Sequence, residues 1–168
     1  VSLGWRDALT RDEVQELQRM QDWRSWWTVL VNWGLVFASF ALVGWWPNVV
    51  TVIVALFVIG ARQLGFAVLM HDASHYALFR GQKLNDWVGN WLGAYPIWGD
   101  VFPYRPYHLQ HHAHTWTDQD PDVSLATPFP ITRQSFGRKV FRDLSGQTGW
   151  KRAKFTLKRD MGWSQGKV

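Results

Sequence analysis

The chain of 168 residues has the length of a single domain, and 47% of its residues are hydrophobic while 18% are charged. This composition excludes an intrinsically disordered protein, and the absence of cysteine excludes disulfide scaffolds and Cys-ligated zinc or iron–sulfur sites. The formal net charge of +5 comes from residues 124–168, which carry +8, whereas residues 1–123 carry −3. A basic segment beside apolar spans is typical of a cytoplasmic membrane face, so we do not expect nucleic acid as a partner.

The N-terminal arm, residues 1–25, contains one predicted helix. Thr10 and Glu13 have the spacing of a capping box, in which each side chain accepts a hydrogen bond from the backbone N–H of the other residue. Apolar residues follow at three-residue intervals from Val14 to Trp23, with charged residues between them. This pattern predicts a short amphipathic helix, which lies either on the membrane surface or on the surface of the protein.

Two apolar stretches within residues 26–70 predict a transmembrane helical hairpin. Residues 26–46 contain no charged residue and would form a helix about 31 Å long, close to the ~30 Å hydrocarbon core of a bilayer, with a pair of Trp at each end. Pro47–Asn48 is the predicted turn, and residues 49–70 form the second stretch. Arg62 interrupts this stretch, and it is predicted either to reach toward the nearer interface or to line a polar pocket.

The distribution of Lys and Arg predicts how this hairpin is oriented. The turn has none, the arm before the hairpin has four, and the chain after residue 70 has thirteen. The positive-inside rule then places both flanks in the cytoplasm, which predicts an integral, multi-pass membrane protein. Residues 84–99 are apolar and rich in Trp but too short to span a bilayer, so they predict an interfacial or re-entrant segment. Residues 124–168 are expected to be a basic cytoplasmic segment.

All six histidines lie in the region of residues 71–123, and five of them form two groups with helical spacing. The first group holds two residues and the second three: His71 and His75, then His108, His111 and His112. Within each group the imidazoles share one helix face, and Pro106 is a favourable first residue for the second helix. The five rings would meet if the two helices pack together, and neutral imidazole suits iron, copper, zinc and nickel.

Two further residues are candidates near this predicted metal site. His114 is outside the helical spacing, and it is either an extra ligand or a partner behind the ligands. Asp72 lies between the first two histidines but points off their face. Its carboxylate could hold the second ring nitrogen of a ligating imidazole, or it could be an ordinary loop carboxylate, and the same alternatives apply to the three aspartates of the DQDPD stretch.

The motifs HDASH, HLQHH and AHTWTDQDPD, placed after an apolar hairpin, resemble the membrane fatty acid desaturase superfamily. The resemblance covers roughly residues 25–160 and includes the RGQKLNDWVGNWLGAYP stretch between the two histidine motifs. It implies an all-α integral membrane fold with a transmembrane hairpin and with histidine-box helices at the cytoplasmic face. By position it implies two non-haem iron ions, with these residues as ligands: His71, His75, His108, His111 and His112.

The resemblance also implies an activity, the O₂-dependent introduction of a double bond into an acyl chain. The substrate would be an acyl lipid, an acyl-CoA or an acyl carrier, and electrons would come from an external donor of the ferredoxin or b-type cytochrome kind. A carotenoid ketolase or hydroxylase of the same superfamily is the first alternative, because it shares the histidine boxes. A haem-binding membrane subunit is the second, although it explains the adjacent His111 and His112 poorly.

The chain departs from the pattern of this superfamily in one respect. No histidine follows position 114, so a third H-x-x-H-H box is absent. We therefore expect the natural protein to continue past Val168 with more apolar spans and this box. The 168 residues by themselves are expected to be inactive, since imidazoles from two helices cover one side of a two-metal site and leave the other open to water.

The predicted orientation can be tested with reporter fusions after residue 25, at residue 48 and after residue 125. The first and third reporters should signal from the cytoplasm and the second from the opposite side, because the Lys and Arg residues flank the hairpin and avoid its turn. A cytoplasmic signal from the reporter at residue 48 would contradict the hairpin.

Overall fold

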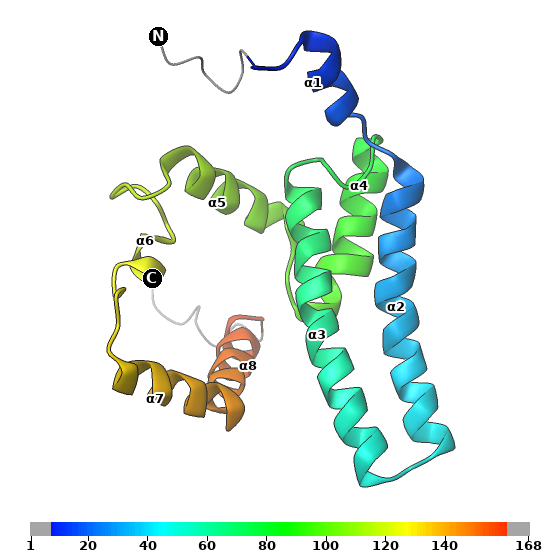
Figure 1. Cartoon of the computed structure of the whole chain (residues 1–168), viewed down its shortest axis with the longest axis vertical. Helices are drawn as coiled ribbons and strands as arrows, with labels where there is room; N and C mark the ends of the chain where they lie inside the picture. Colours follow the sequence, from blue (N-terminus) through cyan, green and yellow to red (C-terminus); the bar gives the residue numbers. More distant parts are fainter. Residues whose placement is uncertain (1–7, 161–168) are drawn as a thin grey trace. The chain divides into compact units, whose positions relative to one another are not determined.

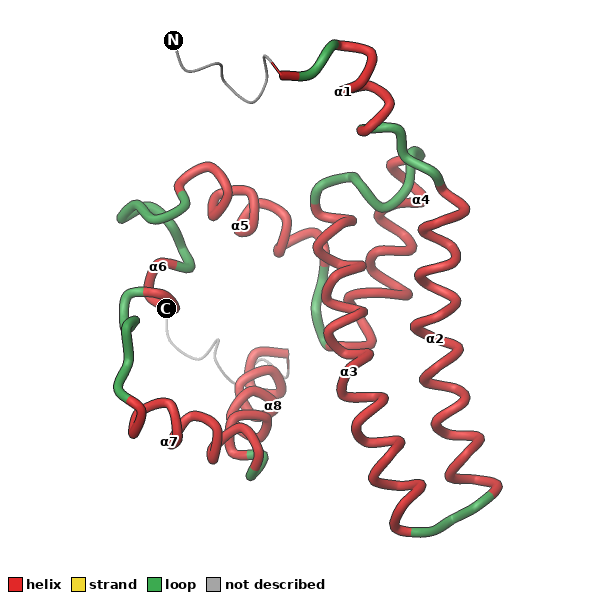
Figure 2. The backbone as a smooth tube through the Cα atoms, viewed as in Figure 1, coloured by secondary structure: helices red, strands yellow, loops and turns green. Residues whose placement is uncertain are grey.

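The computed structural model describes residues 8–160, and the regular secondary structure of this part of the chain is all helix, with no β-strand (Figure 1). Figure 2 shows the helices joined by short loops. The prediction of an all-α protein is thereby confirmed for the described residues. The chain divides into two compact units, the first ending at Leu109 and the second beginning at Gln110.

Helix α1 (Arg11–Leu17) begins with the predicted capping box. Thr10 Oγ1 accepts a hydrogen bond from Glu13 N at 3.3 Å, and Glu13 Oε2 accepts one from Thr10 N at 2.8 Å. The helix is shorter than predicted, because Trp23 belongs to the next helix, α2 (Asp22–Trp45). The amphipathic pattern of the arm is thus divided between two helices.

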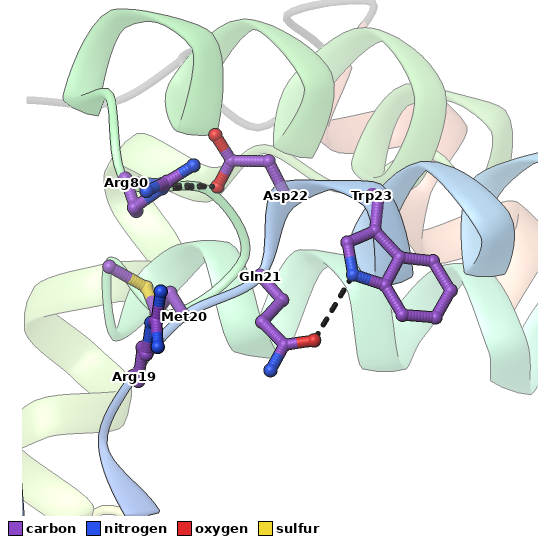
Figure 3. Close-up of a pocket in the computed structure, with 6 residues that line it drawn as sticks. All are labelled: Arg19, Met20, Gln21, Asp22, Trp23 and Arg80. Carbon is purple, nitrogen blue, oxygen red and sulfur yellow. Dashed lines mark hydrogen bonds and ion pairs between the residues drawn. The ribbon is translucent and has the colours of Figure 1, made fainter. Parts of the chain in front are cut away.

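Asp22 fixes the beginning of α2. Its Oδ1 accepts hydrogen bonds from the backbone N and from Nε of Arg80, at 3.2 and 3.4 Å. A carboxylate therefore stands in the first turn, where the helix dipole favours it. A hollow opens beside this pair (Figure 3), and no histidine lines it; its lining residues are Arg19, Met20, Gln21, Asp22, Trp23 and Arg80.

Helices α2 and α3 (Val49–Ser74) lie antiparallel and pack against each other (Figure 1). Asn48 caps α3, since its Oδ1 accepts hydrogen bonds from Val50 N at 2.9 Å and from Thr51 N at 3.1 Å. With 24 and 26 residues, these two helices are the candidate membrane spans in the described part of the chain. Helix α3 continues beyond the predicted end of the second span, so His71 stands within it.

Polar side chains occupy part of the seam between α2 and α3. The buried residues of α2 recur at helical spacing and include two polar ones: Val29, Asn32, Val36 and Ser39. Arg62 Nη1 donates to Asn32 Oδ1 at 3.4 Å across the seam. The half-buried Arg62 is therefore held by the neighbouring helix, and its guanidinium lies between the two helices.

Most apolar side chains of α2 and α3 point away from this seam. Trp45 and Phe57 are 80% and 77% exposed. In the most apolar stretches of the two helices only 22% and 17% of the residues are buried, whereas the core helix of a soluble protein is mostly buried. The described chain thus leaves a large apolar surface on these helices uncovered.

A second helical segment packs on α3 and consists of α4 (Gln82–Val88), η2 (Gly89–Ala94) and η3 (Tyr95–Ile97). The stretch predicted to be interfacial or re-entrant is therefore helical and lies against α3. Its close approach depends on glycine, because a Cβ added at Gly89 would lie 2.3 Å from Ala73 Cβ. Both residues are buried.

The fully buried Asn85 ties this segment to the end of α3. Its Oδ1 accepts hydrogen bonds from Leu78 N and Phe79 N at 3.1 and 3.3 Å, and its Nδ2 donates to Ala73 O at 2.9 Å. Three buried backbone groups thus have their partners in one side chain. Such groups are costly to leave without a hydrogen bond, so this residue fixes the loop after α3.

Helix α5 (Val101–His114) begins five residues before the predicted first residue, Pro106. The reason is a contact from outside the helix. Asn90 Oδ1 accepts a hydrogen bond from Val101 N at 2.8 Å, which satisfies a first-turn N–H group and anchors the beginning of α5 on η2. Val101 itself is fully buried.

The second unit contains three helices within the described residues: α6 (Val123–Ala126), α7 (Arg133–Leu144) and α8 (Gln147–Asp160). Helices α7 and α8 pack against each other. Much of the basic segment is thus helical. On α7, the exposed apolar residues Phe136, Val140 and Leu144 share one face, and Arg138 and Arg142 lie away from it. This arrangement is an amphipathic helix.

Replacing Gly89 by alanine is expected to lower the stability of the fold by about 1–3 kcal/mol, because the new methyl group would overlap Ala73 and push η2 off α3. Gly60→Ala on α3 is the matched control, since nothing lies within 4 Å of a Cβ at that position. It should leave the stability unchanged or raise it by up to about 1 kcal/mol. Thermal unfolding of the purified protein in detergent, followed by circular dichroism, measures both changes. Equal midpoints for the two variants would contradict this packing.

Candidate metal centre

Two histidines stand at the end of α3. His71 lies in its last turns, and His75 is its C-terminal cap, one turn further along the same face. The centroids of the two rings are 4.8 Å apart, and both side chains are half-buried. Between them, Ser74 Oγ donates to His71 O at 2.6 Å, which keeps the last turn of the helix closed.

His108 of α5 completes a cluster of three rings. Its ring centroid lies 4.6 Å from that of His71 and 4.9 Å from that of His75. Its Nε2 is 3.0 Å from His75 Nε2, and the side chain is buried. Histidines from two separate sequence motifs therefore meet.

His112 follows His108 by one turn of the same continuous helix. Each of the four residues offers a ring nitrogen, and these nitrogens all lie within 4.8 Å of one another: His71, His75, His108 and His112. His112 is the exposed member of this group. The site is therefore built from a buried ring, two half-buried rings and one ring at the surface.

The spacing and chemistry of these nitrogens fit a bound transition metal. Imidazole nitrogen binds metals such as zinc at about 2.0–2.1 Å, so two such ligands on one ion lie about 2.8–3.4 Å apart, from right-angle to tetrahedral geometry. The separation of the Nε2 atoms of His75 and His108 is 3.0 Å. A donor set of neutral imidazoles suits iron, copper, zinc or nickel and is unlike the oxygen sites of calcium and magnesium.

Two of the rings are oriented by partners on their other nitrogen. His71 Nδ1 lies 3.0 Å from Asp72 Oδ1, and His108 Nδ1 lies 3.2 Å from Tyr104 Oη. An Nδ1–H that donates to such an oxygen places the lone pair of the neutral ring on Nε2, the nitrogen that would bind a metal. Asp72 was a sequence candidate for this contact. Tyr104 was not, although it precedes His108 by one helical turn.

His111 lies outside the group of four and has a carboxylate partner in the loop after α5. Its Nδ1 donates to Asp120 Oδ1 at 2.7 Å. The buried Asp120 also accepts hydrogen bonds from Trp116 N at 3.0 Å and Asp122 N at 2.8 Å. The bond from His111 and these backbone bonds lower the pKa of Asp120 to about 2, and the same carboxylate raises the pKa of His111. In its neutral form His111 therefore also carries its lone pair on Nε2.

His114 is the last residue of α5 and also lies outside the group of four. Its backbone carbonyl accepts hydrogen bonds from Thr117 N at 2.9 Å and Thr117 Oγ1 at 2.7 Å, which shape the turn that follows the helix. Of the six histidines predicted as site residues, four thus form the group, and His111 and His114 lie outside it.

Comparison with known proteins assigns these features to a family. The sequence model of the fatty acid desaturase family matches residues 44–166, a range that includes every histidine of the chain. An sn-1 oleoyl-lipid 12-desaturase of Arthrospira platensis is 33% identical over 96 residues, which cover 55% of this chain and 26% of that protein. A protein of the same name from a Picosynechococcus species is 25% identical over 132 residues, covering 76% of this chain and 37% of that protein.

A relative with a different name matches as well. A beta-carotene 4-ketolase of Protosiphon botryoides is 32% identical over 85 residues, covering 49% of this chain and 21% of that protein. The matched part of this chain thus spans between a fifth and somewhat over a third of the length of these relatives. No solved structure gives a significant match to this chain.

Replacing His75 or His108 by alanine is expected to lower the iron content of the purified protein at least about tenfold, since each change removes a nitrogen from the centre of the group. Metal content per protein, measured by plasma mass spectrometry, tests this expectation. His114→Ala serves for comparison and should cause a smaller loss, because this ring lies outside the group. If both His75→Ala and His108→Ala keep the full iron content, the assignment is wrong.

Proposed function

Since this chain belongs to the fatty acid desaturase family, we propose that it acts in an acyl desaturase, an enzyme that uses O₂ to introduce a double bond at a histidine-bound di-iron centre. The observation that carries the proposal is the convergence of His71, His75 and His108 from two helices. Amino-acid side chains cannot remove hydrogen from an unactivated methylene group, so a bound metal must supply this chemistry. A cluster of imidazoles beside two apolar helices supports this combination of metal and substrate.

The proposed reaction removes one hydrogen atom from each of two adjacent methylene groups. Two C–H bonds break and a C=C bond forms, while O₂ is reduced to two molecules of water. The two hydrogen atoms taken from the substrate supply half of the reduction, and an external donor supplies two electrons that enter with two protons. The iron ions, when bound, supply the activation of O₂. The residues of the chain hold the metal, orient its ligands and shield it from water.

Each histidine has a proposed role in this centre. The proposed ligands are the five residues with helical spacing: His71, His75, His108, His111 and His112. His114 is a further candidate, as a ligand or as a partner behind the ligands. Asp72, Tyr104 and Asp120 orient three of the rings by accepting a hydrogen bond from Nδ1, and contacts of 3.0, 3.2 and 2.7 Å support this role.

We propose that α2 and α3 span a lipid bilayer as part of a multi-pass protein, with the metal centre at the cytoplasmic face. Their length, their exposed apolar side chains and their low burial support this placement. The end of α3 that carries the histidines is followed by most of the Lys and Arg residues, which supports a cytoplasmic position. The amphipathic, basic helix α7 is of the kind that binds the surface of anionic membranes.

The proposed substrate is an acyl chain attached to a lipid, to CoA or to a carrier protein. Two of the similar proteins are named as oleoyl-lipid desaturases, which favours the lipid form. The proposed electron donor is a ferredoxin or a b-type cytochrome, because the balance of the reaction needs two electrons from outside. A carotenoid ketolase is the second candidate function, and the similarity to a beta-carotene 4-ketolase favours it.

Expression of the protein, in the form in which it naturally occurs, in a host that makes both lipids and carotenoids is expected to add unsaturated fatty acids to the lipids. Gas chromatography of the acyl chains and liquid chromatography of the carotenoids measure the two outcomes in the same cells. The His75→Ala variant, which loses a proposed ligand, should leave both profiles as in the untransformed host. New keto- or hydroxy-carotenoids with an unchanged acyl profile would contradict the desaturase and support the ketolase.

A further inference from the structure

Arg105 lies on α5, one turn before His108, and its side chain reaches the end of α3. Its Nε donates to Ser74 O at 3.0 Å, and its Nη2 donates to Ala73 O at 3.0 Å. These carbonyls belong to the last turn of α3, and that of Ala73 also accepts hydrogen bonds from Tyr76 N at 3.1 Å and Asn85 Nδ2 at 2.9 Å. A cation at this end of a helix is also favoured by the helix dipole.

The guanidinium has two further partners. Its Nη2 also donates to Asp86 Oδ1 of α4, and its Cζ lies 3.9 Å from the centroid of the Tyr76 ring. The side chain of Arg105 is 12% exposed, so these contacts are made largely away from water. A charge in such a place is stable only with good geometry and a full set of partners, and a planar guanidinium provides several donors in fixed directions.

We propose that Arg105 is a positioning residue for the metal centre, which holds His108 at a fixed distance from His75. The proposal rests on the proposed function insofar as it assigns a metal to these histidines. Its partners on α3 and after it, at positions 73, 74 and 76, flank His75 in the sequence. The guanidinium therefore contacts residues on both sides of His75, and these residues determine where the His75 ring lies.

The spacing along α5 explains why one residue can have this effect. Val101, Arg105 and His108 follow one another at intervals of four and three residues, so they share one helix face. Val101 anchors the first turn on η2, Arg105 holds the second turn against α3 and α4, and His108 is the next contact. Without the contacts of Arg105, α5 can rotate about its first turn, and this rotation would move His108 away from His75.

The distance between the two helices can be measured directly in metal-free protein. The chain contains no cysteine, so Val68→Cys on α3 and Leu109→Cys on α5 allow two spin labels to be attached at exposed positions without removing native thiols. Electron–electron distance measurements should give a narrow distribution for the labelled protein and a clearly broader one after Arg105→Gln. Arg80→Gln is the matched control, because Arg80 also pairs with an aspartate but lies on neither helix. It should leave the distribution narrow.

Metal affinity provides the second measurement. Arg105→Gln is expected to weaken binding of iron(II) by about ten- to a hundredfold, the usual cost of losing a group that supports metal ligands. Arg105→Lys should show an intermediate loss, since an ammonium keeps the charge but cannot serve two carbonyls and a carboxylate in fixed directions. The far-ultraviolet circular dichroism of each variant should match that of Arg80→Gln, which shows that the helices are intact.

The possible outcomes separate this proposal from the proposed function. An unchanged distance distribution together with unchanged iron affinity in Arg105→Gln would overturn the positioning role. If Arg105→Gln does not fold, Arg105→Lys and Asp86→Asn replace it, and narrow distributions in both would overturn the role equally. A protein that binds no iron with Arg105 in place, but shows the broadened distribution without it, would refute the proposed function while supporting Arg105 as the residue that holds the histidine helices together.

Discussion

The site depends on the close contact between η2 and the last turns of α3. Because Gly89 has no side chain, its backbone reaches Ala73, and a Cβ would leave only 2.3 Å between the two side chains. This contact places Asn90 where its Oδ1 receives Val101 N at 2.8 Å, and that bond sets the beginning of α5. The first turns of α5 then lie beside the end of α3, and His108 meets the two histidines of the first group. Gly89 of η2 therefore determines where the ring of His108 on α5 lies.

Hydrogen bonds to the backbone carbonyls at the end of α3 fix how the neighbouring helices pack at this junction. A helix end leaves several carbonyl groups without partners, and burial makes each of them costly. At the end of α3 the carbonyl of Ala73 accepts from Asn85 Nδ2 at 2.9 Å and from Arg105 Nη2 at 3.0 Å. Side chains from α4 and α5 thus converge on one group of α3. Apolar packing alone would allow the helices to slide, whereas these directional contacts fix their register beside the histidine cluster.

The shared chemistry of the family explains why relatives with different names match this chain. Desaturases and a ketolase are both similar to it, and the family match includes all of its histidines. In the proposed function, a metal held by imidazoles would supply the oxidising chemistry, and it would need the same ligands whatever the substrate. The identity of the substrate depends on the apolar surfaces that receive it, which can change while the metal ligands stay the same. The matches therefore identify the family of this chain without identifying its substrate.

The sequence by itself determined the features that depend on local spacing. The two apolar helices, the capping box of Thr10 and Glu13, and the one-turn spacings that place His71 near His75 and His108 near His112 follow from periodicities of a few residues, and the structure contains them. Only the tertiary structure decided which rings come together, where α5 begins and which residues support the site. Arg105 meets Ala73 across 32 positions of sequence, and Asn90 meets Val101 across 11. Such partners leave no periodic signal, because they are selected by the packing of whole helices and by the need to satisfy buried polar groups.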